Sequence, residues 1–357
     1  MNAKIFASRS SSLCTPSLIE LGPKLVAAAF QLMKILPAKY IIEGAIERGE
    51  IRPDYPIVES SSGTFALGMG IVCAEQRIPF QIVSDAAIDT RLDEILQNLG
   101  GKVQIVGSGQ GTDENIQVMR LEALRELLHH NPRAFWTKQY DNLDNQRGYR
   151  AFAEQLLRAL GPNIVVVATV GSGGSSCGTI KTLREINPSI KLIGVDTFGS
   201  VLFGLPVAKR QLRGLGNSIH PGNLDHACFD EIHWVSAGDV YYWTRRLHSE
   251  FGLFCGPTSG AAYQVARQLD GQGQTVVFIA PDEGCRYVDT VYNKLWLLDN
   301  GFARSEPSPA PTRVMHPSQA REPWSCIEWN RRTLAEVTSR PHRVVPVMDQ
   351  VGAGPLS

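Results

Sequence analysis

The sequence predicts an α/β fold in two lobes, and three observations lead to it. Short apolar strands alternate with helical patterns along most of the chain, as in parallel sheets flanked by helices. The alternation occurs in two series separated by the polar segment 138–150, KQYDNLDNQRGYR, so we expect two lobes with a cleft between them. The chain has 357 residues, of which 43% are hydrophobic, enough to bury one large core or two moderate ones.

The two series give the expected strands and helices in chain order. In the first, each apolar run is followed by a helical pattern, with strands at 57–59, 80–83 and 103–106 and helices at 63–75, 91–99 and 116–129. The second series contains strands at 164–170, 192–195 and 276–280 and a helix at 179–186.

We divide the chain into two lobes and two tails. Residues 1–14 are interpreted as a disordered tail, 15–51 with 146–304 as a large lobe, and 52–145 as a smaller mobile lobe. Eight of the 21 prolines lie in the last 53 residues, which predicts a Pro-rich tail at 305–357. Within it, PWSCIEWNRRTLAEV is interpreted as a short helix that docks through Trp324, Ile327 and Trp329, as a packing segment rather than a partner-binding motif.

The composition favours a small-molecule site. The 35 basic residues balance the 35 acidic ones, so charge favours neither nucleic acid nor an anionic membrane as a partner. The apolar runs are too short to span a bilayer. Seven widely spaced cysteines without a C-x-x-C pair predict reduced thiols and a cytoplasmic protein, and the eight histidines show no metal-ligand spacing, so we expect no metal.

The segment VGSGGSSCG, residues 170–178, predicts an anion site. Four glycines and three serines before a helix allow backbone N–H groups to converge on a negative charge. A P-loop is excluded because Thr179 and Ile180 follow, without the required lysine. The dinucleotide pattern is broken at Ser176, although Asp196 at the end of the next strand keeps an NAD-dependent dehydrogenase open as an alternative. An ordinary glycine-rich turn is the third interpretation.

Lys34 is the candidate nucleophile of the sequence. It lies among apolar residues in LMKILPAKY, a setting that disfavours the ammonium form and allows a Schiff base, whereas a solvated lysine is the alternative. Two serine- and glycine-rich turns, ESSSGT at 59–64 and CGPTSGAA at 255–262, precede helical patterns. Together with the glycine loop they supply what pyridoxal 5′-phosphate requires: an aldehyde partner, a phosphate anchor and donors for a substrate carboxylate.

As a set, these segments resemble the cysteine synthase family of pyridoxal phosphate enzymes, whose fold type II is shared with cystathionine β-synthase and tryptophan synthase β-subunits. The resemblance runs from TPSLIEL at 15–21 to PDEGCRYVDTVYNKLWL at 281–297 and leaves out both tails. It implies two lobes with parallel-rich sheets and the cofactor in the cleft between them. Lys34 keeps the family's distances to Gly49 and Glu59, whereas Lys39 does not, so the resemblance assigns the imine to Lys34.

Position by position, the resemblance also assigns the cofactor and substrate contacts. Thr258 falls on the hydroxyl that meets the pyridine nitrogen, and Thr64 replaces the asparagine that usually meets the phenolic oxygen. Leu32 and Ile35 replace the serine and aspartate beside the lysine, which puts the donor substrate in question. The implied phosphate loop consists of Gly171, Ser172, Gly173, Gly174 and Ser175, and the implied carboxylate site of Ser61, Ser62, Gly63, Thr64 and Gln139.

The implied reaction is β-replacement on an O-activated L-serine through an aminoacrylate intermediate, in a homodimer. A neutral hydroxyl at the ring nitrogen favours elimination over transamination. The segments ESSSGTFALG, VGSGGSSCGT and LRGLGN are most similar in sequence to an actinobacterial branch of the family that uses O-phosphoserine as the donor. O-Acetylserine is the alternative donor. Arg213 is the candidate for the phosphate, and a solvated basic loop is the equal alternative. Thiosulfate or sulfide as nucleophile would give S-sulfocysteine or cysteine.

Other functions stay open at this point. Within the same chemistry, an amine nucleophile would make a diaminopropionate for siderophore or antibiotic synthesis. From other classes, the alternatives are a catalytically silent scaffold that binds partners through its tail and the NAD-dependent dehydrogenase, which needs Asp196 at a ribose.

Overall fold

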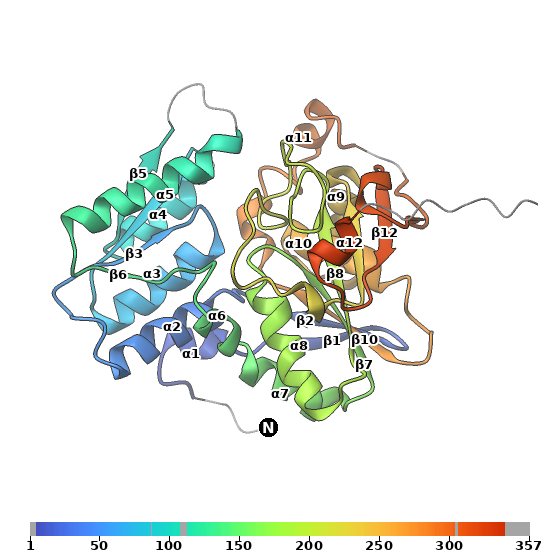
Figure 1. Cartoon of the computed structure of the whole chain (residues 1–357), viewed down its shortest axis with the longest axis horizontal. Helices are drawn as coiled ribbons and strands as arrows, with labels where there is room; N and C mark the ends of the chain where they lie inside the picture. The colour runs from blue at the N-terminus through green and yellow to red at the C-terminus, as the bar shows by residue number, and fades with distance from the viewer. Residues whose placement is uncertain (1–4, 87, 108–112, 304–305, 340–357) are drawn as a thin grey trace, which may run out of the picture.

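Two α/β lobes lie side by side in the computed structural model of the chain (Figure 1). It describes residues 5–86, 88–107, 113–303 and 306–339. One lobe is built on a four-stranded sheet and the other on an eight-stranded sheet. The predicted α/β architecture in two lobes is thus confirmed.

The smaller lobe holds a parallel sheet in the order β5-β4-β3-β6. Three of its strands follow the predicted apolar runs, and β6 is too short to be recognised from a pattern. The strands are β3 (Ile57–Ser60), β4 (Phe80–Asp85), β5 (Lys102–Val106) and β6 (Phe135–Trp136), and the helices are α3 (Thr64–Gln76), α4 (Thr90–Asn98) and α5 (Asp113–His130).

The larger lobe holds a mixed sheet in the order β1-β2-β10-β7-β8-β9-β12-β11. Its five central strands, β2, β10, β7, β8 and β9, are parallel, and β1 and β12 pair antiparallel to the two ends of this set. The strands are β1 (Ser17–Gly22), β2 (Leu25–Ala29), β7 (Ile164–Thr169), β8 (Lys191–Thr197), β9 (Glu231–Val235), β10 (Thr275–Ala280), β11 (Thr312–Arg313) and β12 (Trp324–Glu328).

Helices cover both faces of this sheet, because successive strand residues point to opposite sides. Val166 and Ala168 of β7 face the core with α7 and α8, whereas Val165 and Val167 face the core with α9 and α10. The helices are α2 (Ile35–Glu47), α6 (Asp144–Arg147), α7 (Arg150–Leu160), α8 (Gly174–Ile186), α9 (Ala237–Phe251), α10 (Pro257–Ala266) and α11 (Lys294–Asp299). Among the described helices, none combines the length and apolar character needed to cross a membrane.

The N-terminal segment is more ordered than predicted. Residues Arg9–Leu13 form α1, with Ser8 as the N-cap residue. The backbone N–H and the hydroxyl of Ser10 donate to the Glu75 carboxylate on α3, at 2.7 and 2.6 Å. The expected disordered tail is wrong for this helix, because its partner lies 65 residues away and leaves no local signal. Residues 1–4 are outside the described part.

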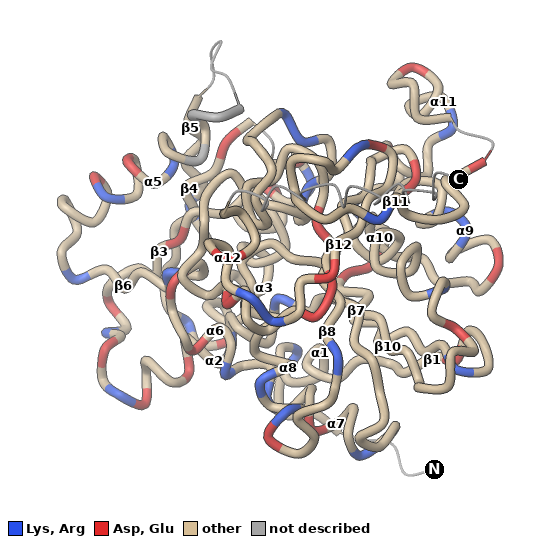
Figure 2. The backbone as a smooth tube through the Cα atoms, turned by 45° about the vertical axis from the view of Figure 1, so that its right-hand side comes forward, with Lys and Arg blue, Asp and Glu red and all other residues tan. Residues whose placement is uncertain are grey.

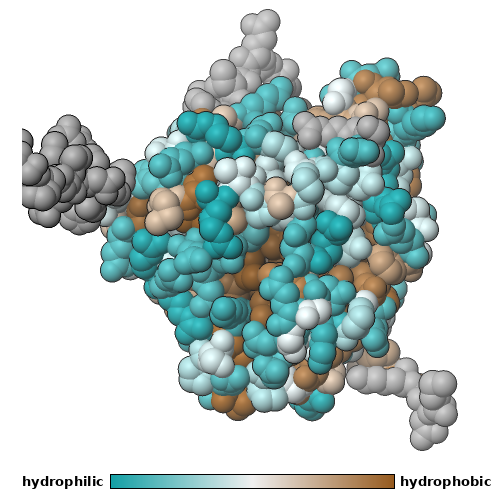
Figure 3. All heavy atoms as spheres, turned by 90° about the vertical axis from the view of Figure 1, so that its right-hand side faces the viewer, coloured by the Kyte–Doolittle hydropathy of each residue, from teal (hydrophilic) through white to brown (hydrophobic). Residues whose placement is uncertain are grey.

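The C-terminal segment also differs from the expectation. Trp324 and Ile327 lie on strand β12, which pairs with β9, and the short helix α12 (Leu334–Thr338) comes later. The docking helix through these residues is therefore wrong, since an open strand edge at β9 is better covered by another strand. Trp329 is fully buried against Phe203, which agrees with a packing role. This end of the lobe is mostly hydrophilic outside, with scattered apolar areas (Figure 3). Residues 340–357 lie outside the described part.

Contacts between the lobes hold the cleft in its observed form. Asp89, the N-cap residue of α4, accepts from Arg286 Nε at 3.0 Å, and Arg91 pairs with Asp289 at 2.9 Å. A Cβ on Gly68 of α3 would lie 2.9 Å from the backbone oxygen of Lys34. The smaller lobe therefore packs directly on the segment that carries the predicted nucleophile. The predicted boundaries at residues 51/52 and 145/146 stay predictions.

Candidate active site

Lys34 lies at the foot of the cleft, immediately before α2. The two residues before it fix its position: Met33 N–H donates to Pro281 O at 2.8 Å, and Leu32 forms a bridge with Asp282. These contacts attach the lysine to the carboxyl end of β10, the edge of a parallel sheet at which such folds bind ligands.

The Lys34 amino group is poised as a nucleophile. No described residue forms a hydrogen bond or an ion pair with its Nζ. Burial lowers the pKa of Lys34 to about 8, because the charged form loses hydration. At pH 7 an amine with this pKa is neutral in roughly one molecule in ten, against about one in 3,000 for an ordinary lysine. The apolar neighbours in the sequence predicted this direction.

The predicted phosphate loop joins β7 to α8 and has the shape of an anion cradle. The helix begins at Gly174 instead of the predicted Thr179, so Gly174 and Ser175 present backbone N–H groups in its first turn. Gly173 has φ +81°, and a Cβ there would lie 2.6 Å from Leu224 Cα. A Cβ on Gly174 would lie 2.1 Å from Asn145 Oδ1. The backbone can take this path only with glycine.

A cavity of about 470 Å³ lies between the lobes and brings most of the predicted site together. Thr258, Gly173, Gly174 and Ser175 are not part of its wall. Thr258 is in the first turn of α10, behind Gly214, whose Cβ would lie 3.6 Å from Thr258 Cγ2. The predicted residues that line the cavity are Lys34, Ser61, Ser62, Gly63, Thr64, Gln139, Gly171, Ser172 and Arg213.

The predicted carboxylate site consists of two segments of the smaller lobe. The turn after β3 carries Ser61, Ser62 and Gly63, and α3 begins at Thr64, so a helix N-terminus starts beside the cavity. Gln139 reaches this turn from the loop after β6, and its Nε2 donates to Ser60 O at 2.8 Å. Their roles in binding a carboxylate stay predictions.

Three functional candidates were missed in the sequence. Arg120 on α5 lines the cavity although it is only 7% exposed; its Nη1 lies 3.0 Å from Asp85 and donates to Ser62 Oγ at 3.3 Å. Arg120 Nε has no hydrogen-bond partner among the described residues. Tyr140 hydrogen-bonds Arg120, and burial raises the pKa of its hydroxyl. No local pattern marks these side chains, because three separate elements bring them together.

The residues that line the cavity are more basic than the chain as a whole. Figure 2 shows basic and acidic positions interspersed over both lobes, in agreement with the net charge of zero. Among the described residues that line the cavity, the only acidic one is Asp85. The loop 207–218 forms one wall, and Arg210 Nη1 closes it by donating to Ser218 Oγ at 2.9 Å. The basic residues of the wall are Lys34, Arg120, Lys209, Arg210 and Arg213.

These features fit pyridoxal phosphate: an amine of lowered pKa without a side-chain partner, and a glycine cradle at a helix N-terminus. The family of pyridoxal-phosphate dependent enzymes matches residues 33–282 of the sequence. The chain belongs to this family. The assignment of the cofactor is confirmed, while the individual contacts predicted for it stay predictions.

Relatives and solved structures agree with this assignment. The enzyme is 33% identical to the N-(2-amino-2-carboxyethyl)-L-glutamate synthases of Cupriavidus metallidurans, over 77% of this chain and 83% of that one, and of Ralstonia nicotianae, over 76% and 82%. An O-acetylserine dependent cystathionine β-synthase from Helicobacter pylori has a TM-score of 0.74 at 25% identity, covering 82% of this chain and 100% of that one. O-Acetyl serine sulfhydrylase isoform 3 from Entamoeba histolytica has a TM-score of 0.74 at 21% identity, covering 85% and 98%.

The enzyme is thus a fold type II, pyridoxal-phosphate dependent enzyme of the cysteine synthase type with β-replacement chemistry. Asp196, which the dehydrogenase alternative places at a ribose, is completely buried, and burial raises the pKa of its carboxyl to about 7. A Cβ on Gly216 would lie 3.0 Å from Asp196 Oδ1, so the carboxylate lies behind the loop that forms the cavity wall.

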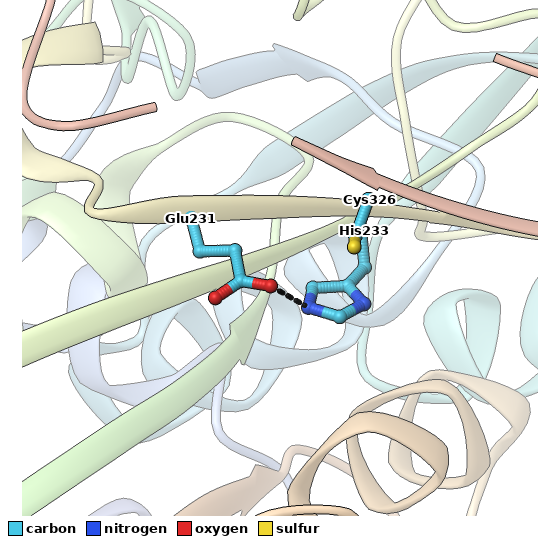
Figure 4. Close-up of side chains that lie close together, drawn as sticks. All are labelled: Glu231, His233 and Cys326. Atoms are coloured by element: carbon cyan, nitrogen blue, oxygen red, sulfur yellow. Dashed lines mark ion pairs between the residues drawn. The ribbon is translucent and has the colours of Figure 1, made fainter. Parts of the chain in front are cut away.

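A second group of titratable residues lies outside the active site, between β9 and β12 (Figure 4). His233 Nε2 lies 3.0 Å from Glu231, and Trp324 Nε1–H donates to His233 Nδ1 at 3.0 Å. Because an indole is only a donor, the proton of the neutral ring belongs on Nε2, the nitrogen that a metal would need. Burial raises the pKa of the Cys326 thiol to about 11. We therefore interpret these residues as hydrogen-bonded strand contacts, and the expected absence of a metal stays a prediction.

Proposed function

We propose that the enzyme replaces the activated hydroxyl group of an O-activated L-serine by the amino group of an acidic amino acid, giving an N-(2-amino-2-carboxyethyl) amino acid. The basic wall of the cavity is the observation that supports this proposal. The two relatives described above are named for this type of product with L-glutamate. The amine-adding alternative from the sequence is therefore placed ahead of the sulfur nucleophile.

Charge distinguishes L-glutamate from sulfide as the nucleophile. An O-phosphoserine donor brings roughly two negative charges on its phosphate at pH 7, and glutamate brings two carboxylates. Lys209, Arg210 and Arg213 lie on the loop that forms one cavity wall, and Arg120, which pairs with Asp85, also lines the cavity. Buried anions need such partners to offset lost hydration, and sulfide, with at most one charge as HS⁻, needs fewer of them than glutamate does. The loop therefore suits two polyanionic substrates better than one anion and a small thiol.

Different residues of the chain have different roles in the proposed reaction. Pyridoxal phosphate, when bound, supplies an electron sink for the carbanion at the α-carbon. Lys34, released by the substrate amine, would take the α-proton on Nζ, since its pKa of about 8 keeps part of it neutral. Ser61, Ser62 and Gln139 bind the α-carboxylate. Closure of the smaller lobe would exclude water during the replacement.

A sulfur nucleophile is the second candidate. Thiosulfate is a dianion and would suit the same basic loop, giving S-sulfocysteine, whereas sulfide would give cysteine. The donor also has two candidates, because O-acetylserine, unlike O-phosphoserine, leaves the guanidinium groups without a phosphate partner.

A competition experiment tests the proposal. Holoenzyme would be incubated with O-phospho-L-serine and equal concentrations of L-glutamate, thiosulfate and sulfide, and the products would be quantified by mass spectrometry. We expect the glutamate adduct to exceed the sulfur products at least tenfold, because only glutamate and thiosulfate bind the basic wall and only the former matches the relatives. A product mixture dominated by cysteine or S-sulfocysteine would refute the amine proposal and favour the second candidate.

The basic loop gives a further prediction. Arg213→Ala should raise the KM for O-phosphoserine about 30-fold, equivalent to about 2 kcal/mol for a charge-assisted contact, and leave that for O-acetylserine nearly unchanged. Arg210→Ala is the matched comparison, because the two guanidinium charges influence different tyrosines. The charge of Arg210 opposes the raised pKa of Tyr140, and the charge of Arg213 opposes that of Tyr241. A larger effect at Arg210 would place the phosphate beside Tyr140. Equal losses for both donors in both variants would contradict a phosphate site on this loop.

A further inference from the structure

Glu59, at the end of β3, is a buried carboxylate to which the proposed reaction gives no role. It is 1% exposed and accepts four hydrogen bonds, two on each oxygen. Oε1 accepts from the Ser60 backbone N–H at 2.7 Å and from Trp136 Nε1–H at 3.3 Å. Oε2 accepts from the Thr137 hydroxyl at 2.5 Å and from the Gln139 backbone N–H at 2.9 Å.

These donors come from the two segments that form the predicted carboxylate site. Ser60 leads directly into the serine turn, and Gln139 lies on the loop after β6. Gln139 Nε2 returns a hydrogen bond to Ser60 O, so the two segments and the Glu59 carboxylate form a closed ring of contacts. Both segments continue into the cavity wall, through Ser61 and through Gln139 itself.

The contacts suit the ionised form of Glu59. Burial raises the pKa of its carboxyl, and the hydrogen bonds from its four donors oppose that shift. Four donors occupy the four lone-pair positions of a carboxylate. A proton on Oε1 would face the Ser60 and Trp136 N–H groups, which cannot accept it, and a proton on Oε2 would require the Thr137 hydroxyl to turn and accept. A buried charge with no opposite charge among its hydrogen-bond partners is costly to maintain.

We propose that Glu59 is a positioning residue for the amino-acid substrate. Its carboxylate fixes the serine turn and Gln139 relative to each other, so that the two segments bind the α-carboxylate of the substrate together. The inference rests on β-replacement at an amino acid and is independent of which nucleophile follows.

The variant Glu59→Gln changes one of these contacts in particular. The side chain keeps its shape, and its amide NH₂ group fits best beside Thr137, whose hydroxyl can turn round to accept. Ser60 and Trp136 then keep an oxygen acceptor, but the Gln139 N–H faces a donor. The substitution therefore displaces Gln139 and its loop and leaves the serine turn in place.

Kinetics and binding of the holoenzyme test this inference. For Glu59→Gln we expect the KM of the serine donor to rise roughly tenfold, the scale of one lost hydrogen bond to a charged acceptor, with kcat within about twofold. The dissociation constant of L-alanine, which has no leaving group, should rise by a similar factor in an absorbance titration. Ethylamine, which lacks a carboxylate, should bind as in the wild type. Glu94→Gln, an exposed carboxylate on α4, is the control and should change nothing.

The inference is overturned if kcat falls at constant KM, or if L-alanine and ethylamine lose affinity equally, because either result indicates a general structural role. If Glu59→Gln does not fold, Thr137→Val removes one donor at Oε2 and should give the same pattern at roughly threefold; unchanged L-alanine binding would then contradict the inference. Failure of the proposed function is distinct, since it is seen in the products of the wild type.

Discussion

Lys34→Ala should abolish β-replacement and leave a folded protein. The change removes the group that we assign to cofactor attachment and α-proton transfer, with an expected loss of at least 10³-fold in kcat. It creates little cost in the apoprotein, because Lys34 Nζ forms no hydrogen bond or ion pair with any described residue and burial disfavours its charge. Turnover with O-phosphoserine and far-UV circular dichroism would be measured on the same samples.

Lys39→Ala is the matched control. Lys39 is five residues further along, pairs with Glu43 on α2 and is not part of the cavity wall. We expect this variant to keep wild-type turnover. Substantial activity in Lys34→Ala with unchanged circular dichroism, or a loss in Lys39→Ala of the same size, would contradict the role assigned to Lys34.

Gly173→Ala should weaken cofactor binding by about 100-fold or more. Gly173 has φ +81°, and the new Cβ would lie 2.6 Å from Leu224 Cα and 2.7 Å from Asn223 O. Backbone atoms cannot turn aside as a side chain can, so the loop itself must shift and its N–H groups move away from the phosphate. The dissociation constant of pyridoxal phosphate, titrated into apoprotein, measures the effect.

Gly252→Ala separates backbone strain from the clash. Gly252 has φ +69° with no heavy atom within 4 Å of an added Cβ, so it carries the strain alone, roughly 1 kcal/mol of stability. We expect a small fall in melting temperature and unchanged cofactor affinity for this control. If Gly173→Ala binds the cofactor as tightly as Gly252→Ala does, the loop is not the phosphate cradle.

Strands of the parallel sheets were predictable where burial on both faces gives a continuous apolar run. β7, IVVVAT, is such a run, and its predicted span differs by one residue from the observed one. β6 has two residues and no pattern of its own. β12 was interpreted as a helix because its pairing with β9 depends on a strand edge that a distant part of the chain leaves open. Such tertiary contacts are not encoded in local periodicity.

The candidate site was likewise predictable only where its residues are contiguous in the sequence. Lys34 and the glycine loop carry their chemistry in contiguous residues, so their types and spacing sufficed to find them. Arg120, Asp85 and Tyr140 come from α5, the end of β4 and the loop after β6, and meet only in the fold. Arg120 is one polar position of a helical pattern in the sequence, where it has no feature that distinguishes a solvated side chain from a buried one.

Peptide mapping after borohydride reduction identifies the lysine that carries the cofactor. Reduction of the holoenzyme fixes the pyridoxyl group on the lysine that holds it, and proteolysis with mass spectrometry locates that residue. We expect the label on Lys34, in the segment attached to Pro281 and Asp282 at the foot of the cleft. A label on Lys39 or on another lysine, or no labelled lysine at all, would contradict it.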